Sequence, residues 1–219
     1  MNIASYIDHT ILKQDTTAAD ISTLCQEALK EGFAAVCIPP FFIAQAKLLL
    51  DKSPVKVATV VGFPLGYQSL VTKLAEIEDA IHQGVDELDI VHNLSALKSG
   101  DWDYLAKEIT ACTQLAHQHG KAVKIIVESG LLTEEELIKC CELYAPIHID
   151  YMKTSTGFAA KGADLQAVAT MRKYLPDTIK IKAAGGIRTA SFAKELIAAG
   201  ANRLGCSASV AIVNELKEL

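Results

Sequence analysis

Short apolar runs rich in β-branched residues alternate with amphipathic stretches along the whole chain. Eight of these runs have the length of buried strands, and the stretches between them have helical periodicity. The expected strands span residues 5–9, 33–38, 55–61, 86–91, 121–127, 148–153, 178–183 and 202–205. Strands and helices therefore alternate at the spacing of βα units.

Capping residues mark several of the expected helices. Thr17 with Asp20, and Thr133 with Glu136, have the spacing of a capping box at a helix start, and Gly32 is placed to end the first helix. Glycines also follow the expected ends of three further helices: Gly84, Gly120 and Gly200. These positions support the alternation that the apolar pattern predicts.

Eight βα units predict a (β/α)₈ TIM barrel, with residues 1–219 forming a single α/β domain. The alternative is a doubly wound open sheet. The barrel is favoured because eight strands are expected and no G-x-G-x-x-G follows the first of them. No low-complexity segment or Pro/Gly/Ser linker divides the chain.

Several expected strands carry a charged residue at every second position. Glu87 and Asp89, for example, alternate with Leu88 and Ile90. A strand has a period of two, so in a barrel the apolar face packs on the helices and the charged face lines the lumen. The expected lumen set is Asp8, Glu87, Asp89 and Glu128 against Lys124, Lys153, Lys180 and Lys182.

The position of each charged residue along its strand separates structural candidates from catalytic ones. Glu87, Lys124 and Lys180 lie early in their strands and are expected to form structural ion pairs. The others lie near the carboxyl ends of the strands, the face at which barrel enzymes work, and are catalytic candidates.

Lys153 and Lys182 each lie at the end of an apolar run. An ammonium group without water costs several kcal/mol unless it is paired or loses its proton. One of the two is therefore a candidate neutral amine, and hence a nucleophile that forms a Schiff base. The alternative is a lysine that extends from a strand end into solvent.

Two loops carry features of a phosphate site. Gly185 and Gly186 follow the seventh expected strand, and Gly205 and Ser207 follow the eighth. Loops after these strands commonly bind phosphate in this barrel, although simple turn glycines are the alternative. Two arginines, Arg188 and Arg203, can add positive charge there, although solvated side chains near helix ends are the alternative.

Three other features have both a functional and a structural interpretation. Asp89 and Asp8 can move protons or hold ion pairs, and the loop V-G-F-P-L-G at 61–66 can form a pocket wall or turn the chain. For Cys37 a buried structural thiol is favoured over a reactive one.

The composition of the chain argues against several classes of partner and ligand. The net charge is −5, which disfavours a nucleic-acid partner. No signal peptide is expected, and no apolar stretch reaches the ~18 residues of a membrane span. The six cysteines form no C-x-x-C and the histidines form no ligand cluster, so we expect reduced thiols, a cytoplasmic location and no metal site.

The chain resembles the 2-deoxyribose-5-phosphate aldolase family over essentially its full length. The matching segments are I-D-H-T-I-L, V-G-F-P-L-G, E-L-D-I-V, V-K-I-I-V-E-S, M-K-T-S-T-G-F, K-A-A-G-G-I-R and R-L-G-C-S. The order and spacing of K-T-S-T-G-F and K-A-A-G-G-I-R are highly specific for this family.

The resemblance implies a class I aldolase on a TIM barrel, without metal or cofactor. Such an enzyme cleaves 2-deoxy-D-ribose 5-phosphate reversibly to D-glyceraldehyde 3-phosphate and acetaldehyde, in deoxyribose phosphate catabolism. Lys153 matches the Schiff-base lysine, and Lys182 the second lysine, whose positive charge favours the neutral form of the first. Asp89 matches a proton relay and Asp8 a supporting carboxylate. Thr10 matches a polar wall residue, and the positions around the phosphate are Gly157, Gly185, Gly186, Gly205 and Ser207.

The sequence departs from the family pattern at four places. Phe158 stands where some members have a lysine near the phosphate, and Ala208–Ser209 replaces a frequent Ser-Gly pair. Ser129 replaces a usual threonine. The chain ends in K-E-L, where some members end in a tyrosine that assists proton transfer, so that assistance is expected from elsewhere or not at all.

Three alternatives remain beside this interpretation. They are a Schiff-base aldolase for another phosphosugar, a barrel isomerase without carbon–carbon cleavage, and a non-catalytic phosphate-binding module. Each explains the lysine pair less well. The expected assembly is a homo-oligomer, with a dimer favoured.

Overall fold

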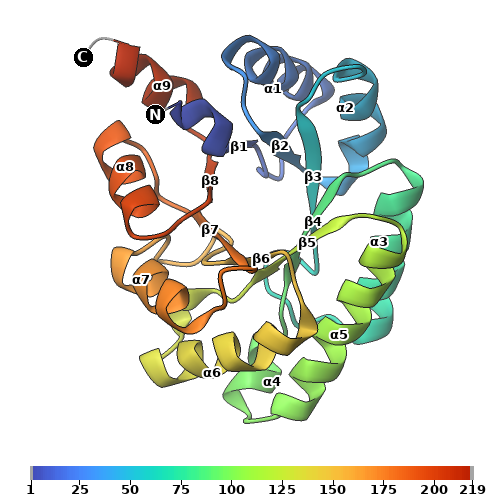
Figure 1. Cartoon of the computed structure of the whole chain (residues 1–219). Helices are drawn as coiled ribbons and strands as arrows, with labels where there is room; N and C mark the ends of the chain where they lie inside the picture. The colour runs from blue at the N-terminus through green and yellow to red at the C-terminus, as the bar shows by residue number, and fades with distance from the viewer. Residues whose placement is uncertain (1, 218–219) are drawn as a thin grey trace.

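Eight parallel strands close into a barrel in the order of the chain (Figure 1), in a computed structural model that describes residues 2–217. The strands are β1 Ile7–Thr10, β2 Ala35–Ile38, β3 Lys56–Val61, β4 Glu87–Val91, β5 Ala122–Ile126, β6 Tyr151–Lys153, β7 Lys180–Ala184 and β8 Arg203–Cys206. All eight predicted strands are confirmed, with bounds that shift by a few residues. The pairing of β1 with β8 closes the sheet, which confirms the TIM barrel over the open sheet.

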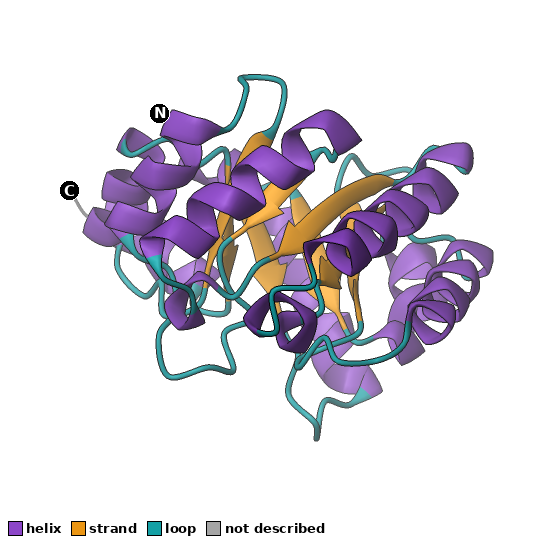
Figure 2. Cartoon of the chain, turned by 90° about the horizontal axis from the view of Figure 1, so that it is seen from below, coloured by secondary structure: helices purple, strands orange, loops and turns teal. Residues whose placement is uncertain are grey.

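Helices form a ring outside the strands (Figures 1 and 2). The α-helices are α1 Ala18–Glu31, α2 Ile43–Leu49, α3 Leu70–His82, α4 Leu94–Lys98, α5 Trp102–Gln118, α6 Glu134–Tyr144, α7 Leu165–Tyr174, α8 Ala190–Ala198 and α9 Ser209–Lys217. Short 3₁₀ turns are η1 Ile3–Tyr6, η2 Pro40–Phe42, η3 Ser129–Leu131 and η4 Ala145–Ile147. Within residues 2–217, no helix combines the length and the apolar character that crossing a membrane requires.

The predicted helix caps are present. The Thr17 hydroxyl accepts a hydrogen bond from the backbone of Asp20, whose carboxylate accepts one from the backbone of Thr17, and Thr133 and Glu136 do the same for α6. Gly32 ends α1 with φ 70°, a left-handed conformation that favours glycine. Local sequence therefore sets where these helices begin and end.

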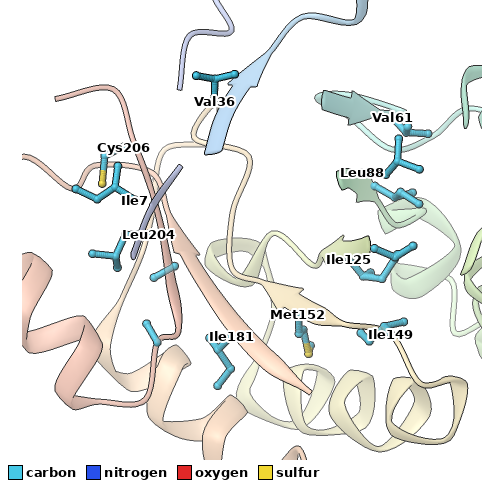
Figure 3. Close-up of a cluster of buried hydrophobic side chains, with 14 of the residues drawn as sticks. Ile7, Val36, Val61, Leu88, Ile125, Ile149, Met152, Ile181, Leu204 and Cys206 are labelled. Atoms are coloured by element: carbon cyan, nitrogen blue, oxygen red, sulfur yellow. The ribbon is translucent and has the colours of Figure 1, made fainter. Parts of the chain in front are cut away.

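The main apolar core lies between the strands and the helical ring. Figure 3 shows its strand contribution, which includes Ile7, Val36, Leu88, Ile125 and Ile181, all with no exposed surface. Because a strand alternates its side chains, the neighbours of these residues must point into the barrel. Packing of the outer face thus forces the intervening charged residues into the lumen.

A buried ion pair joins two helices of the ring to the end of β4. Lys73 of α3 donates to Glu108 of α5 at 2.9 Å and to the carbonyl of Val91 at 2.8 Å, and neither charged side chain is exposed. The other Glu108 oxygen accepts from the backbone N–H of Asn93 at 2.9 Å. The pair therefore holds the backbone just after the strand that carries Asp89.

We expect Lys73→Met to lower the free energy of unfolding by about 3–5 kcal/mol, because it leaves the Glu108 charge buried and unpaired. Lys73→Met with Glu108→Gln removes both charges and keeps an acceptor for Asn93, so the double variant should be more stable than the single one. Chemical denaturation measures both.

Lys47→Met is the matched control. Lys47 pairs with Asp86 at 2.9 Å, but its side chain is 38% exposed, so the loss should be at most about 1 kcal/mol. A Lys73→Met variant no less stable than this control would contradict the expected role of the buried pair.

Candidate active site

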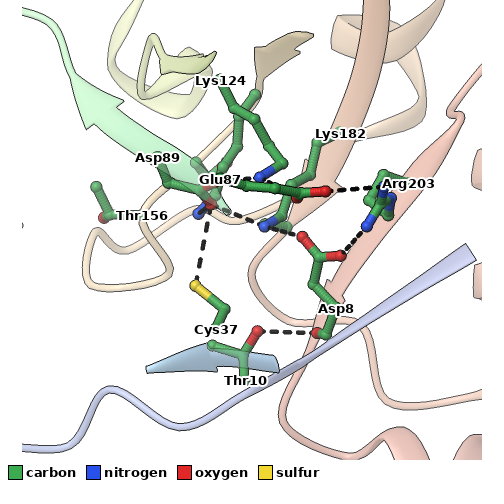
Figure 4. A network of polar contacts seen from close by, with 12 residues as sticks. Asp8, Thr10, Cys37, Glu87, Asp89, Lys124, Thr156, Lys182 and Arg203 are labelled. Carbon is green, nitrogen blue, oxygen red and sulfur yellow. Dashed lines mark hydrogen bonds and ion pairs between the residues drawn. The ribbon is translucent and has the colours of Figure 1, made fainter. Parts of the chain in front are cut away.

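Three lysines converge on one carboxylate inside the barrel. Asp89 of β4 accepts from Lys153 of β6 at 2.7 Å and from Lys182 of β7 at 2.7 Å, and both nitrogens contact the same oxygen, Oδ2. Its second oxygen, Oδ1, accepts from Lys124 of β5 at 2.8 Å. Asp89 has no exposed surface, and Figure 4 shows it together with Lys124 and Lys182.

A second set of charges lies beside this centre. Asp8 of β1 binds Lys182 through Oδ2 and Arg203 of β8 through Oδ1, the latter at 2.6 Å. Glu87 pairs with Lys124 at 2.6 Å, which confirms the structural ion pair expected for those two residues. The three carboxylates Asp8, Glu87 and Asp89 therefore form one continuous ion-pair network with Lys124, Lys153, Lys182 and Arg203. Figure 4 labels most of its members.

Two predictions about basic residues are wrong. Lys180, expected in a lumen ion pair, is exposed, and its ammonium lies 5.5 Å from the centre of the Tyr151 ring. Arg203, expected near the phosphate, instead points into the lumen, where it contacts Asp8 and Glu87. The first residue of β7 lies at the barrel rim and remains in solvent, while the arginine of β8 takes the position in the network.

Glu128 is also placed differently from its prediction as a lumen residue of the fifth strand. That strand ends at Ile126, and Glu128 has φ 50°, so strand alternation no longer sets its direction. Its carboxylate accepts from the hydroxyl and the backbone N–H of Thr156, in the loop after β6. It braces this loop next to Lys153 and does not join the ion-pair network.

The network holds Asp8, Asp89 and Lys182 in their charged forms. Burial by itself would raise the pKa of Asp89, but Lys124, Lys153 and Lys182 outweigh it and hold that pKa well below the usual range. Burial is likewise outweighed at Asp8, where Lys182 and Arg203 lower the pKa to about 2. Burial would lower the pKa of Lys182, but Asp8 and Asp89 raise it well above the usual value. Lys182 therefore remains an ammonium ion.

A cavity of about 530 Å³ opens above this network. Lys153 lines it, whereas Lys124, Lys182, Asp8 and Asp89 lie beneath its wall. The structure brings the other predicted binding residues to the same cavity: Thr10, Gly157, Gly185, Gly186, Gly205 and Ser207. Arg188 also lines it, as predicted, and the Thr10 hydroxyl donates to the carbonyl of Asp8 at 2.9 Å (Figure 4).

Glycines are required where two loops of the cavity touch. Gly185 has φ 88°, and a Cβ there would lie 3.0 Å from the Cα of Gly162 and 3.2 Å from that of Gly157. Gly162 was not predicted as a site residue, yet a Cβ there would lie 2.3 Å from the Gly185 carbonyl oxygen. This close backbone contact brings the loops after β6 and β7 together and shapes the cavity floor.

Other wall residues were missed by sequence reasoning. Asp20, Thr23 and Glu27 of α1 line the cavity, and their spacing of three and four residues places them on one helix face. That spacing is visible in the sequence, but nothing local shows that the face points toward the loops of β7 and β8. Phe158 lies at the mouth, where its ring meets Phe63 of the loop after β3 edge-on at 5.2 Å.

Cys37 fits the structural interpretation. It is fully buried, its sulfur lies 4.0 Å from Oδ2 of Asp89, and burial is the main cause that raises the pKa of its thiol. Across residues 2–217, no group of three or more His, Cys, Asp or Glu side chains is arranged to hold a metal ion. The expectation about the chain end falls partly on Glu218 and Leu219, which lie outside the described residues.

Comparison with known proteins agrees with this geometry. The model of the DeoC/LacD family of aldolases matches residues 2–212. The chain belongs to this aldolase family. It is 48% identical to a deoxyribose-phosphate aldolase of Caldicellulosiruptor saccharolyticus over 97% of both chains, and 49% identical to one of Thermococcus gammatolerans over 97% of this chain and 96% of that one.

A solved structure supports the same assignment. The deoxyribose phosphate aldolase of Aeropyrum pernix, described as a unique tetramer, superposes with a TM-score of 0.91 at 32% identity and covers 98% of this chain and 91% of its own. The family assignment and the barrel therefore rest on both sequence and structure.

Proposed function

We propose that this chain is a class I deoxyribose-phosphate aldolase in which Lys153 forms the Schiff base. The assignment to Lys153 rests on which lysine a substrate in the cavity can reach. Of the three lysines that contact Asp89, only Lys153 lines the cavity, where a substrate carbonyl can reach it.

The network explains how Lys153 can act as a neutral amine. Four basic groups, Lys124, Lys153, Lys182 and Arg203, surround three carboxylates, Asp8, Glu87 and Asp89. The excess positive charge favours loss of one proton from the network. Lys182 is held as an ammonium ion by Asp8 and Asp89, so the lysine proposed to react is Lys153, which lines the cavity.

The reaction then proceeds through an iminium ion. Nζ of Lys153 attacks C1 of 2-deoxy-D-ribose 5-phosphate, and the carbinolamine loses water. The C3 hydroxyl gives up its proton, the C2–C3 bond breaks, and its electron pair moves into the iminium to form an enamine. Glyceraldehyde 3-phosphate leaves, the enamine is protonated at C2, and hydrolysis releases acetaldehyde and restores the amine.

Asp89 and Lys182 are proposed to handle the protons of these steps. Both lysines share Oδ2 of Asp89, so a proton can pass between them through one atom or through water beside it. Because the pKa of Asp89 is low, its carboxylate holds a proton only briefly. Lys182 is an ammonium ion before the substrate binds, so it is the group that can donate a proton. Asp8 supports Lys182 from the opposite side.

The phosphate is proposed to bind at the loops after β7 and β8. Gly185, Gly186 and Gly205 line the cavity with backbone alone, Ser207 adds a hydroxyl, and Arg188 adds positive charge. Gly157 and Thr10 complete the wall. Holding the phosphate there orients the sugar so that C1 lies at Lys153.

Reductive trapping tests this function. We expect sodium borohydride with 2-deoxyribose 5-phosphate to inactivate the enzyme, and peptide mass spectrometry to place the reduced adduct on Lys153. The same treatment without substrate is the control. An adduct on Lys182, or turnover without any adduct, would contradict the assignment. A donor panel of acetaldehyde against dihydroxyacetone separates this activity from that of other Schiff-base aldolases.

We further propose that residues 1–219 act as one catalytic domain in the cytoplasm and assemble as a homodimer. The buried free thiols support a reducing compartment, and the Aeropyrum pernix relative shows that this family can form oligomers. Light scattering coupled to gel filtration measures the assembly directly.

A further inference from the structure

A histidine of β1 links two helices on the outer side of the barrel. His9 Nε2 lies 2.7 Å from Oε2 of Glu27 in α1, and Nδ1 lies 2.9 Å from Oγ of Ser209, the first residue of α9. His9 is 4% exposed and Ser209 has no exposed surface. Helices α1 and α9 both contact β1 (Figure 1), so the ring is held between three elements of the fold.

The hydrogen bonds of this group determine which atoms donate. The Ser209 hydroxyl, which has a single proton, donates to the carbonyl of Cys206 at 2.9 Å, so its oxygen accepts from Nδ1 of His9. An ionised Glu27 can only accept, so Nε2 must donate as well. All three bonds are satisfied together only when both ring nitrogens carry hydrogen. His9 and Glu27 both line the cavity wall.

The Glu–His–Ser order resembles the arrangement of a hydrolase triad, but the site does not fit that chemistry. Ser209 is fully buried and its proton is directed to the Cys206 carbonyl, away from the imidazole that would have to remove it. No substrate can reach its oxygen. The group therefore acts by holding other atoms in place.

The segment that it holds is the loop proposed to bind the phosphate. Gly205 and Ser207 line the cavity, and Cys206 lies between them. The hydrogen bond from Ser209 to the Cys206 carbonyl anchors the loop at that point, and the bond between Ser209 and His9 anchors its end. Glu27, whose side chain is 40% exposed, in turn anchors the imidazole to α1. These anchors therefore hold the loop backbone in position at the cavity.

We propose that His9 is a positioning residue for the phosphate end of the cavity, where it fixes the β8–α9 loop through Ser209. The inference rests on the proposed function, because it takes that loop to bind the phosphate of the substrate. It assigns His9 no contact with the reacting carbonyl. Its effect should therefore appear in recognition of the phosphate and not in the chemistry at Lys153.

The test compares 2-deoxyribose 5-phosphate with 2-deoxyribose in His9→Leu. We expect KM for the phosphorylated sugar to rise about 10-fold or more, from loss of the hydrogen bonds that anchor the loop, with kcat within about threefold of the parent. The kcat/KM for 2-deoxyribose should not change. A fall in kcat/KM by the same factor for both sugars would overturn the proposal, since a general loss of structure has that effect.

Further variants keep the result interpretable. Glu27→Leu removes the anchor of the ring at a half-exposed side chain, and should reproduce the phosphate-specific rise in KM even where His9→Leu fails to fold. Glu27→Gln keeps an acceptor for Nε2 and should restore most of the affinity. A Glu27→Leu variant with unchanged KM for the phosphorylated sugar would overturn the proposal.

Ser207→Asp separates this inference from the proposed function. A negative charge in the loop should raise KM for the phosphorylated sugar only. If it does so while His9→Leu and Glu27→Leu do not, the positioning role is wrong and the phosphate site stands. If Ser207→Asp leaves the discrimination between the two sugars unchanged, the proposed phosphate site itself is wrong, and the role of His9 with it.

Discussion

Lys153→Met should abolish aldol cleavage, with kcat reduced by about 10⁴-fold or more, because no other amine in the network reaches the cavity. The variant should also form no adduct with substrate and borohydride. Methionine fills a similar volume, and Asp89 keeps its ion pairs with Lys124 and Lys182, so we expect the fold to be retained. Steady-state kinetics and intact-protein mass spectrometry measure both effects.

Lys180→Met is the matched control for this prediction. It removes a lysine from the adjacent strand of the same barrel, but one that is exposed and is not among the ion-pair partners of Asp89. Its kcat and KM should equal those of the parent enzyme. Residual activity of Lys153→Met above a few per cent, with trapping at another lysine, would show that the cavity admits a second nucleophile.

Asp89→Asn should destabilise the protein at neutral pH by about 3 kcal/mol or more, because it leaves Lys124, Lys153 and Lys182 buried without their shared charge. The amide of this variant would also be unable to accept the proton that the mechanism routes through Oδ2, so activity should be lost in parallel. Urea denaturation measured across a pH series tests the stability effect.

The sign of the pH dependence follows from the direction of the shift. The pKa of Asp89 in the folded protein lies well below its ordinary value of 3.8, so its stabilising contribution is complete above that value and is lost as the pH falls below it. Asp8, with its pKa lowered to about 2, behaves in the same way. The parent protein should therefore lose stability steeply in acid, and Asp89→Asn should lose less.

Asp177→Asn is the control for the stability measurement. Asp177 is fully exposed and lies 3.6 Å from Arg172. Its replacement should lower the free energy of unfolding by at most about 1 kcal/mol and leave the loss of stability in acid unchanged. If Asp89→Asn were as stable as this control at neutral pH, the buried network would not hold the charges that the mechanism requires.

The lumen shows how far strand alternation can be used for prediction. It placed Asp8, Glu87, Asp89, Lys124, Lys153 and Lys182 correctly because each lies within a regular strand whose other face packs on helices. It failed at Lys180, which begins its strand at the rim, and at Glu128, which lies beyond the strand in a left-handed conformation. Alternation determines direction only inside a regular strand, and says nothing about depth in the barrel.

The sequence by itself determined the eight βα units, the helix caps, the charged lumen and, through its motifs, the aldolase family. These features depend on periodicity and on short segments, which are local properties of the chain. Only the tertiary structure decided that Lys153 and Lys182 share one oxygen of Asp89, and that Lys153 lines the cavity while Lys124 and Lys182 do not. It also decided that Arg203 enters the network and that His9 joins Glu27 to Ser209. Those facts depend on barrel closure, because register and depth bring residues from distant strands within hydrogen-bond distance, and no local pattern encodes them.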